Sequence, residues 1–365
     1  MNTATRTVIF LAVIALVRPV IGDVVQVDCS SPDQTLTQAL NTAKLGDTLR
    51  ITGTCKETVT ITTDDLTLEG DNQTVLDGHG TNRDVLTIDG ARRVAIKQMT
   101  VQHGANGIHI TRGATVTIDG VTVQDNADDG MEVGHNATAT IAQTTAQRNA
   151  DDGFVIDQNA TATFTNCIAK DNHDNGFFVL RAASAQFIGT TMSMGNGHNG
   201  VRLSLGAGAT LTGTVTSANN KRSGIDIALS ASGSLNRAMV TVEKNGRRGI
   251  SVAMNGSLLT AGGTLESNRN KAEGIRVSTG GSLALLGTTT RVDGNRDGLV
   301  VALSASVYGS KKTKIIAQNN AQFGVVVFAD ASGILLGEVN AEANPAWDCM
   351  TQHPSRKGNQ WCLHR

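Results

Sequence analysis

The chain has 365 residues, with 31 Lys and Arg against 32 Asp and Glu, so its charge gives no reason to expect a nucleic-acid partner. Only 3% of residues are aromatic and 17% are charged, while glycine occurs 40 times and proline 4 times. This composition, with its many Val, Ile and Thr residues, excludes a disordered chain and a helical bundle, and it favours a repetitive β-rich fold.

The N-terminal segment has the features of a secretory signal peptide. Arg6 precedes an apolar run at residues 8–17, and small residues occur before Asp23, so we expect residues 1–22 to be removed on export. The alternative is an uncleaved anchor, because Arg18 lies close to the cleavage site. The apolar run is short for a bilayer, so we expect no membrane span after signal removal and a secreted or periplasmic bacterial protein.

Export permits disulfide bonds, and the five cysteines allow two of them. We expect Cys29 to pair with Cys55 near the start, and Cys349 with Cys362 near the end. Cys167 is left over. It aligns with inward-facing positions and is predicted to be a buried, unreactive thiol.

Residues 23–46 are predicted to form an N-terminal cap. Leu36, Ala39, Leu40 and Ala43 share one helical face, so residues 34–44 are expected to form an amphipathic helix that covers the open end of the β fold. At the other end, we expect residues 345–365 to form a disulfide-bridged C-terminal cap.

A period of about 24 residues runs through the chain between these caps. Ten glycines from Gly107 to Gly324 are spaced 23 to 26 residues apart, and eight of them follow an asparagine by four residues. After each glycine, apolar and variable residues alternate, as in a short strand. One unit cannot close a core alone, so the units must stack, and residues 47–344 are predicted to form a parallel β-helix.

The asparagine of each unit is predicted to have a structural role. Asparagine tolerates a left-handed bend, and its side chain can form a hydrogen-bonded ladder from coil to coil. We expect both features at this fixed turn position.

The Asn-x-x-x-Gly-apolar-x-apolar units between Asn126 and Val327, with the entry segment 38–49, resemble the right-handed parallel β-helix repeats of the pectin-lyase-like superfamily. The resemblance extends over most of the chain and implies a right-handed solenoid. It leaves the activity open, because this superfamily includes pectate lyases, polygalacturonases, alginate epimerases and lyases, and non-catalytic periplasmic accessory proteins.

The three positions between each asparagine and its glycine are predicted to form an exposed column along one edge, and the charge of this column changes sign along the chain. The early turns hold Asp128, Asp129, Asp151, Asp152, His173 and Asp174, whereas the later turns hold His198, Lys221, Arg222, Arg247 and Arg248. Because adjacent coils lie about 4.8 Å apart, neighbouring carboxylates can repel, share a proton or hold a cation. Calcium is the candidate metal, with Asp128, Asp129, Asp151 and Asp152 as ligands. The alternative is a set of solvated carboxylates that cap local backbone amides.

If the chain is an enzyme, the resemblance implies a polysaccharide lyase, epimerase or glycoside hydrolase. Pectate lyases need acidic calcium ligands and a basic residue, for which Asp152, Asp174 and either Arg181 or Arg202 are the nearest candidates. His173-Asp174 matches half of the epimerase Asp-Pro-His-Asp motif, and polygalacturonase motifs have only partial counterparts. The candidate catalytic residues are therefore Asp152, His173, Asp174 and Arg202.

The outward residue of the strand after each glycine forms a second column. Here Phe178 is a candidate sugar-stacking platform and Arg202 a carboxylate contact. The predicted substrate-binding residues are Phe178, His198, Lys221, Arg222, Arg247 and Arg248. The even glycine spacing leaves no long loops to wall a deep cleft.

The sequence therefore predicts an exported, monomeric β-helix that binds, and could process, an acidic polysaccharide along one solenoid face. The alternative is a non-catalytic periplasmic or surface interaction module, for which a protein partner replaces the glycan.

Overall fold

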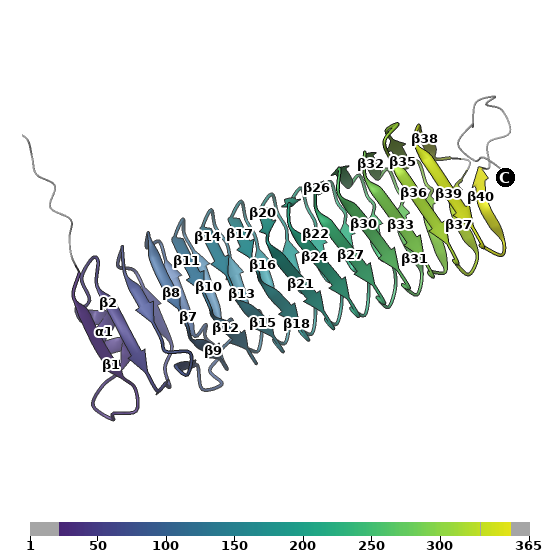
Figure 1. Cartoon of the computed structure of the whole chain (residues 1–365). Coiled ribbons are helices and arrows are strands. Elements are labelled where there is room, and N and C mark those ends of the chain that lie inside the picture. The colour runs from purple at the N-terminus through teal and green to yellow at the C-terminus, as the bar shows by residue number, and fades with distance from the viewer. Residues whose placement is uncertain (1–21, 329, 352–365) are drawn as a thin grey trace, which may run out of the picture.

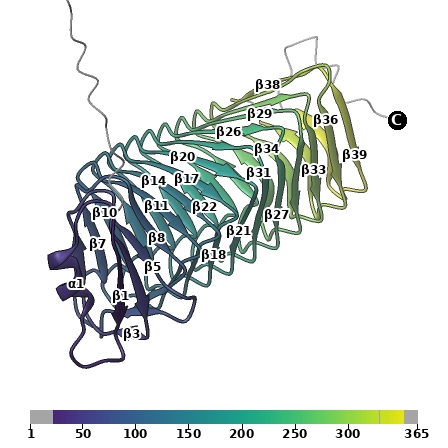
Figure 2. The same ribbon diagram turned by 60° about the vertical axis from the view of Figure 1, so that its left-hand side comes forward.

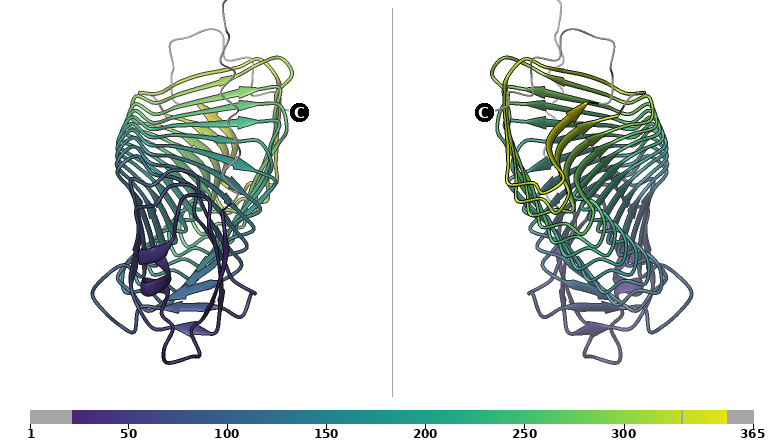
Figure 3. Two further views of the ribbon diagram at one scale, coloured as in Figure 1. Left: turned by 90° about the vertical axis from the view of Figure 1, so that its left-hand side faces the viewer. Right: turned by 90° about the vertical axis from the view of Figure 1, so that its right-hand side faces the viewer.

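The computed structural model describes residues 22–328 and 330–351, which wind into one elongated solenoid (Figure 1). Three parallel sheets, A, B and C, run along its length with 14, 13 and 13 strands, and from β2 onward the chain visits them in that order. The end-on views show each coil lying over the next (Figure 3). The predicted all-β parallel solenoid is therefore confirmed for the described residues.

The strands of each sheet follow one another at intervals of one coil. Sheet A consists of β1 (Val24–Asp28), β2 (Thr48–Thr52), β5 (Thr67–Glu69), β8 (Val94–Lys97), β11 (Thr115–Asp119), β14 (Thr138–Ala142), β17 (Thr161–Thr165), β20 (Ser184–Ile188), β23 (Gly208–Leu211), β26 (Ser232–Asn236), β29 (Ser257–Ala261), β32 (Ser282–Leu286), β35 (Ser306–Gly309) and β38 (Ser332–Leu335). Sheet B consists of β3 (Thr54–Cys55), β6 (Val75–Asp77), β9 (Thr100–Gln102), β12 (Thr122–Gln124), β15 (Thr145–Gln147), β18 (Ile168–Lys170), β21 (Thr190–Met194), β24 (Thr214–Ala218), β27 (Met239–Glu243), β30 (Thr264–Asn268), β33 (Thr289–Asp293), β36 (Lys314–Gln318) and β39 (Glu338–Glu342). Sheet C consists of β4 (Val59–Ile61), β7 (Leu86–Asp89), β10 (Ile108–Thr111), β13 (Met131–Val133), β16 (Phe154–Ile156), β19 (Phe177–Val179), β22 (Val201–Leu203), β25 (Ile225–Ile227), β28 (Ile250–Val252), β31 (Glu273–Val277), β34 (Asp297–Val301), β37 (Phe323–Val327) and β40 (Trp347–Thr351).

Side chains that point inward from the three sheets fill one continuous core. The columns stack as predicted, so that Ile118 pairs with Ile141, which in turn pairs with Phe164. In the middle coils neighbouring ring centroids lie 5.0 to 5.3 Å apart in a cluster of Phe154, Phe164, Phe177 and Phe187. Cys167 is buried in this core as predicted, and burial raises the pKa of its thiol to about 11.

The repeated asparagines form a buried ladder along the turn between sheets B and C, which we call the Asn turn. From Asn126 to Asn344, each side-chain Nδ2 donates to the Oδ1 of the next coil's asparagine at 2.9 to 3.3 Å. The ladder is confirmed, but the left-handed bend lies one residue earlier than predicted, as at Asp125 and Lys244. The backbone N–H of each asparagine also donates along the ladder, as from Asn149 to Asn172, so the bend falls on the residue before it.

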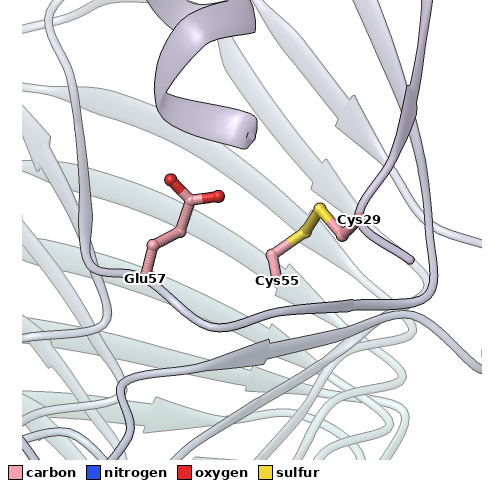
Figure 4. Close-up of side chains that lie close together, drawn as sticks. All are labelled: Cys29, Cys55 and Glu57. Atoms are coloured by element: carbon pink, nitrogen blue, oxygen red, sulfur yellow. A yellow bond between two sulfur atoms is a disulfide. The ribbon is translucent and has the colours of Figure 1, made fainter. Parts of the chain in front are cut away.

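Helix α1 (Leu36–Thr42) covers the N-terminal end, inside the predicted range 34–44 (Figure 2). Thr35 begins the helix with a capping box, in which its Oγ1 accepts the Gln38 N–H and Gln38 Oε1 accepts the Thr35 N–H. Glu57 of the first coil accepts the Leu36 N–H at 2.7 Å, close to the predicted Cys29–Cys55 disulfide, which is confirmed (Figure 4). These contacts fasten the cap to the solenoid.

Strand pairing continues at both ends beyond the predicted range 47–344. Within the predicted N-terminal cap, β1 pairs with β2, and within the predicted C-terminal cap, β40 pairs with β37. These two outer strands supply hydrogen-bond partners for backbone groups of β2 and β37 that would otherwise have none. The predicted signal peptide, apart from Gly22, and Cys362 lie outside the described residues, so the Cys349–Cys362 disulfide stays a prediction. In the described part of the chain, no helix is long and apolar enough to cross a bilayer.

Candidate functional site

The outer face of sheet C is recessed. Its outward side chains stack in register in the predicted column, formed by His109, Glu132, Val155, Phe178, Arg202, Asp226, Ser251, Arg276, Val300 and Val326. Four of the ten are buried and six are half-buried, whereas the outward residues at the centres of the sheet A strands are half-buried or exposed, as at Thr163, Thr117 and Gln186. This column is therefore less accessible than its counterpart on sheet A, and we call it the floor of a shallow groove whose edges are the turns on either side.

The Asn turns form one edge of this groove. The Asn turns of the early coils carry acidic side chains. Carboxylate oxygens of Asp128, Asp129 and Asp151 lie within 4.8 Å of one another, and so do those of Asp151, Asp152 and Asp174. The four predicted calcium ligands thus fall into two groups that share Asp151, and the second group also includes Asp174 of the next coil. Carboxylate oxygens are the ligands that calcium prefers, so the donor set fits this ion.

A second polar ladder, which the sequence analysis did not foresee, runs from Asp84, which precedes Val85, through the residues just before the repeat glycines as far as Ser223. At each step a side-chain oxygen accepts the backbone N–H of the equivalent residue one coil on, at 2.6 to 3.1 Å, through Asp84, Asn106, Asp129, Asp152, Asn175, Asn199 and Ser223. These positions were predicted to be exposed, but several are buried, because their side chains lie against the next coil and accept its backbone N–H groups. The recurrence of Asn or Asp directly before successive glycines was the available signal.

Two carboxylates are adjacent in this second ladder. Burial, and then the neighbouring Asp152 carboxylate, raise the pKa of Asp129 to about 8. Burial also raises the pKa of Asp152 to about 7, although hydrogen bonds from Asn175 oppose the rise. Asp152 is only 4% exposed, and its Oδ1 accepts from both the backbone and the amide of Asn175. A predicted catalytic residue is therefore held inside the turn.

The other predicted catalytic residues lie on the two following coils. His198 Nδ1 contacts Asp174 Oδ1, and both side chains are partly open to solvent. Burial, and then the positive charges of Arg222 and Arg202, lower the pKa of His198. His173 lies in the same turn as Asp174 and near Asp151, whose pKa is raised chiefly by burial and by Asp128. The structure thus brings the Asp174 carboxyl group and the His198 imidazole into contact at the groove edge.

Arg202 on the floor connects this group to the predicted sugar platform. Its guanidinium carbon lies 5.2 Å from the centroid of the Phe178 ring, and its Nε lies 4.0 Å from Asp226 Oδ2. Nε itself is buried with no hydrogen-bond partner among the described residues. Phe178 is half-buried under Arg202, so one face of its ring is already occupied.

The predicted basic residues divide into two groups. Lys221, Arg222 and Arg247 are exposed in successive Asn turns. Arg248 is instead held at 3.0 Å by the buried carboxylate of Glu273, which leaves little of its side chain open to a ligand.

Glu273 is the centre of an ion-pair cluster that the sequence analysis missed. Besides Arg248, it binds Arg276 at 2.8 Å and Arg296 at 3.1 Å, and Arg296 also binds Asp297 at 2.8 Å. The acidic residues before Gly274 and Gly298 were the available signal, at the position that Asp129 and Asp152 occupy earlier.

At the N-terminal end of the groove, His109 Nδ1 lies 2.9 Å from Asp84 Oδ2. This hydrogen bond raises the pKa of His109. The chain also makes a longer loop at residues 78–85, beside which a cavity of about 240 Å³ is lined by Gly80, Thr81, Asn82, His103, Gly104, Asp125, Asn126 and Ala127. One modest wall is therefore present before the evenly spaced coils begin.

The chain matches the family model described as a right-handed beta helix region over residues 59–192. No curated protein sequence matches it. Similar solved structures include the A-module of the Azotobacter vinelandii mannuronan C-5 epimerase AlgE4, with a TM-score of 0.62 and 16% identity over 87% of this chain and 92% of the module. The AlgE6 A-module from the same organism gives 0.52 and 18% over 87% and 93%, and the pectate lyase Pel9A gives 0.52 and 15% over 80% and 78%.

At these identities the similarity concerns the fold. Together with the three-sheet solenoid, it confirms the predicted resemblance: the chain has the right-handed parallel β-helix fold of pectin-lyase-like proteins.

Proposed function

We propose that the groove over sheet C binds an acidic polysaccharide laid along the solenoid axis. The observation that carries this proposal is the row of cations beside the recessed floor. Arg202 lies on the floor, and exposed Lys221, Arg222 and Arg247 follow in the adjoining Asn turns. A polymer with regularly repeated carboxylates can meet several of these cations at once, which multiplies weak contacts into useful affinity.

The similar folds support the same class of ligand. The two Azotobacter modules are named for mannuronan and Pel9A for pectate, and both are polyuronates. Their resemblance to this chain supplies a scaffold, and the cationic row of this chain supplies the reason to expect an anionic polymer.

The acidic turns at the other end of the groove would repel such a polymer unless a cation lay between them. We therefore propose that calcium binds at Asp128, Asp129, Asp151 and Asp152 and neutralises this stretch. The Cys29–Cys55 disulfide is typical of an oxidising compartment, which fits the proposed secreted or periplasmic location where such polymers occur.

Binding is tested by titrating the whole protein with polymannuronate, polygalacturonate and a neutral glucan, with calcium or with a chelator. We expect micromolar to millimolar binding of the two acidic polymers, weakened by salt and by the chelator, and no binding of the glucan. The variant Arg222→Ala with Arg247→Ala should raise Kd about tenfold, since two charge-assisted contacts are lost. Lys311→Ala with Lys312→Ala removes two exposed charges elsewhere and is the matched control.

If neither acidic polymer binds, or if the control variant weakens binding as much as the test variant, the proposal is wrong. A blank result with every glycan, together with a cross-linked protein partner, would instead support the non-catalytic interaction module.

The Asp174–His198 pair favours a second candidate, acid–base chemistry on the bound uronate. A neutral histidine oriented by a carboxylate can take up a proton, and Arg202 can hold the substrate carboxylate nearby. Asp152 is buried, so in this scheme it positions the turn that faces Asp174. Incubation with polymannuronate should then yield an epimerised or unsaturated product that is absent with His198→Ala, although that variant still binds the polymer. Wild-type protein that binds without any product would leave binding alone as the function.

A further inference from the structure

A column of side chains lines the second edge of the groove, at the corner between sheets C and A. One member follows each floor residue by three positions, and we call Arg112, His135, Gln158, Arg181, Leu205, Leu229, Met254, Thr279 and Leu303 the corner column. All nine have a left-handed backbone, with φ between 46° and 55°. From His135 onward, their carbonyls accept N–H groups of the preceding coil, as Leu229 does from Gly206. The backbone is therefore uniform while the side chains vary.

The corner column changes character at Arg202. Before it, all four corner side chains are polar, and three of them contact the preceding coil: Arg112 contacts Asp89, His135 Nδ1 lies 3.2 Å from Thr111 Oγ1, and Arg181 contacts Asp157. After it they become apolar apart from Thr279, with exposed fractions of 48%, 39%, 51% and 52% at Leu205, Leu229, Met254 and Leu303.

These apolar residues are unfavourable for the isolated chain in two ways. A left-handed backbone disfavours a bulky side chain and suits asparagine or glycine. An exposed aliphatic side chain also forgoes the free energy that burial would provide. Their repetition over several coils beside a groove indicates a surface that is buried when a ligand is bound.

The shape of the apolar surface favours a linear polymer over a protein. It is a single file with one side chain per coil, and on its sheet A side lie the small residues Gly208, Ser232, Ser257, Ser282 and Ser306. A stable protein interface needs a broad apolar centre. A chain that runs along the axis needs only one contact every ~4.8 Å, the separation of adjacent strands.

The chemistry of the two edges restricts the polymer further. Aliphatic side chains pack around small convex groups, whereas the flat face of a sugar ring is matched by an aromatic ring. Across the groove, Arg222 and Arg247 remain exposed and favour free carboxylates. An O-acyl group adds an apolar surface and keeps the carboxylate, whereas a methyl ester would remove the charge.

We propose that the C-terminal half of the groove selects an O-acylated acidic polysaccharide, whose acyl groups pack along Leu205, Leu229 and Met254. This inference rests on the proposed function, because it assumes that the polymer lies in the groove.

The first test compares three forms of one polyuronate of matched length by calorimetric titration of the whole protein: O-acetylated, deacetylated and methyl-esterified. The O-acetylated form should bind about tenfold more tightly than the deacetylated form, as expected for burying one or two methyl groups. The methyl-esterified form should bind least. Equal affinity for the first two forms would overturn this inference alone, whereas a lack of binding by every charged form would overturn the proposed function itself.

The second test uses Leu229→Asn with Met254→Asn. Asparagine suits the left-handed backbone, so the melting temperature should stay equal or rise, while the tenfold preference for the acetylated polymer disappears and binding of the deacetylated polymer is unchanged. Thr279→Asn, at the same corner, is the control and should keep the preference. If the double variant unfolds more easily, Leu229→Gly with Met254→Gly repeats the test. A preference that survives in the folded double variant, or is lost in the control, contradicts the inference.

Discussion

The coils before Arg202 and those after it share one backbone but present opposite surfaces. In the earlier coils the residue before each glycine continues a polar ladder through Asp129 and Asp152, and the corner column is polar. In the later coils the same positions hold the Glu273 ion-pair cluster and exposed aliphatic residues. The Asn ladder runs through both halves without a break. In this solenoid, then, the ladder and the core keep the coils stacked, which leaves the outward positions free to differ.

The aromatic core, which lies where the two halves meet, should contribute more to stability than any other feature considered below. Phe177→Ala should lower the free energy of unfolding by about 3 to 5 kcal/mol, because it removes a ring that packs on Phe154, Phe164 and Phe187 and leaves a cavity. Ile250→Val, at the same inward position in the later half, should cost about 1 kcal/mol. Guanidinium unfolding measures both, and equal costs would show that the aromatic cluster adds nothing special.

The Asn ladder should contribute equally to both halves. Asn149→Ala and Asn245→Ala each remove the Oδ1 atom that accepts the backbone N–H and one side-chain N–H of the preceding asparagine. Each substitution should therefore lower the free energy of unfolding by about 2 to 3 kcal/mol. Asn236→Ala at an exposed strand end is the control and should cost less than about 0.5 kcal/mol. Costs that differ strongly between the two ladder variants would refute a shared scaffold.

The stability of the two halves should depend on pH in opposite directions. The raised pKa of Asp129 and Asp152 means that the folded protein keeps protons that the unfolded chain releases above about pH 4, so this half loses stability as pH rises from about 4 to about 8. In the later half, burial is outweighed by the Glu273 backbone N–H and by Arg248 and Arg276, which lower the pKa of Glu273. Its contribution is therefore present above about pH 4.5 and is lost as pH falls below that value.

Asp152→Asn should abolish much of the loss of stability at high pH and raise the free energy of unfolding at pH 8 by about 1 to 2 kcal/mol. Asparagine fits this position, since Asn175 and Asn199 already occupy the same ladder. Thermal unfolding between pH 4 and pH 9, with a chelator present so that no calcium holds these carboxylates ionised, measures this effect. An unchanged pH profile in the variant would show that the two carboxylates do not hold a proton in the folded state.

The stacking of the coils could be predicted from the sequence because glycine, asparagine and the inward apolar residues recur at one period. Which turn side chains are exposed and which bind the neighbouring coil could not be predicted. Asp128 and Asp129 are neighbours in sequence, yet one is exposed and the other joins a ladder, a difference set by contacts with the coils on either side. Arg248 likewise looked like a free cation until the fold placed Glu273, 25 residues later, beside it. Spacing alone reveals columns, but it does not reveal which members of a column bind one another.

Hydrogen–deuterium exchange with and without polyuronate shows whether an acidic polymer lies in the groove over sheet C. We expect slower exchange in the Asn turns at residues 195–200, 219–224 and 244–249, with no change on the outer face of sheet B. Protection confined to sheet B, or no protection at a polymer concentration that saturates binding, would contradict this expectation.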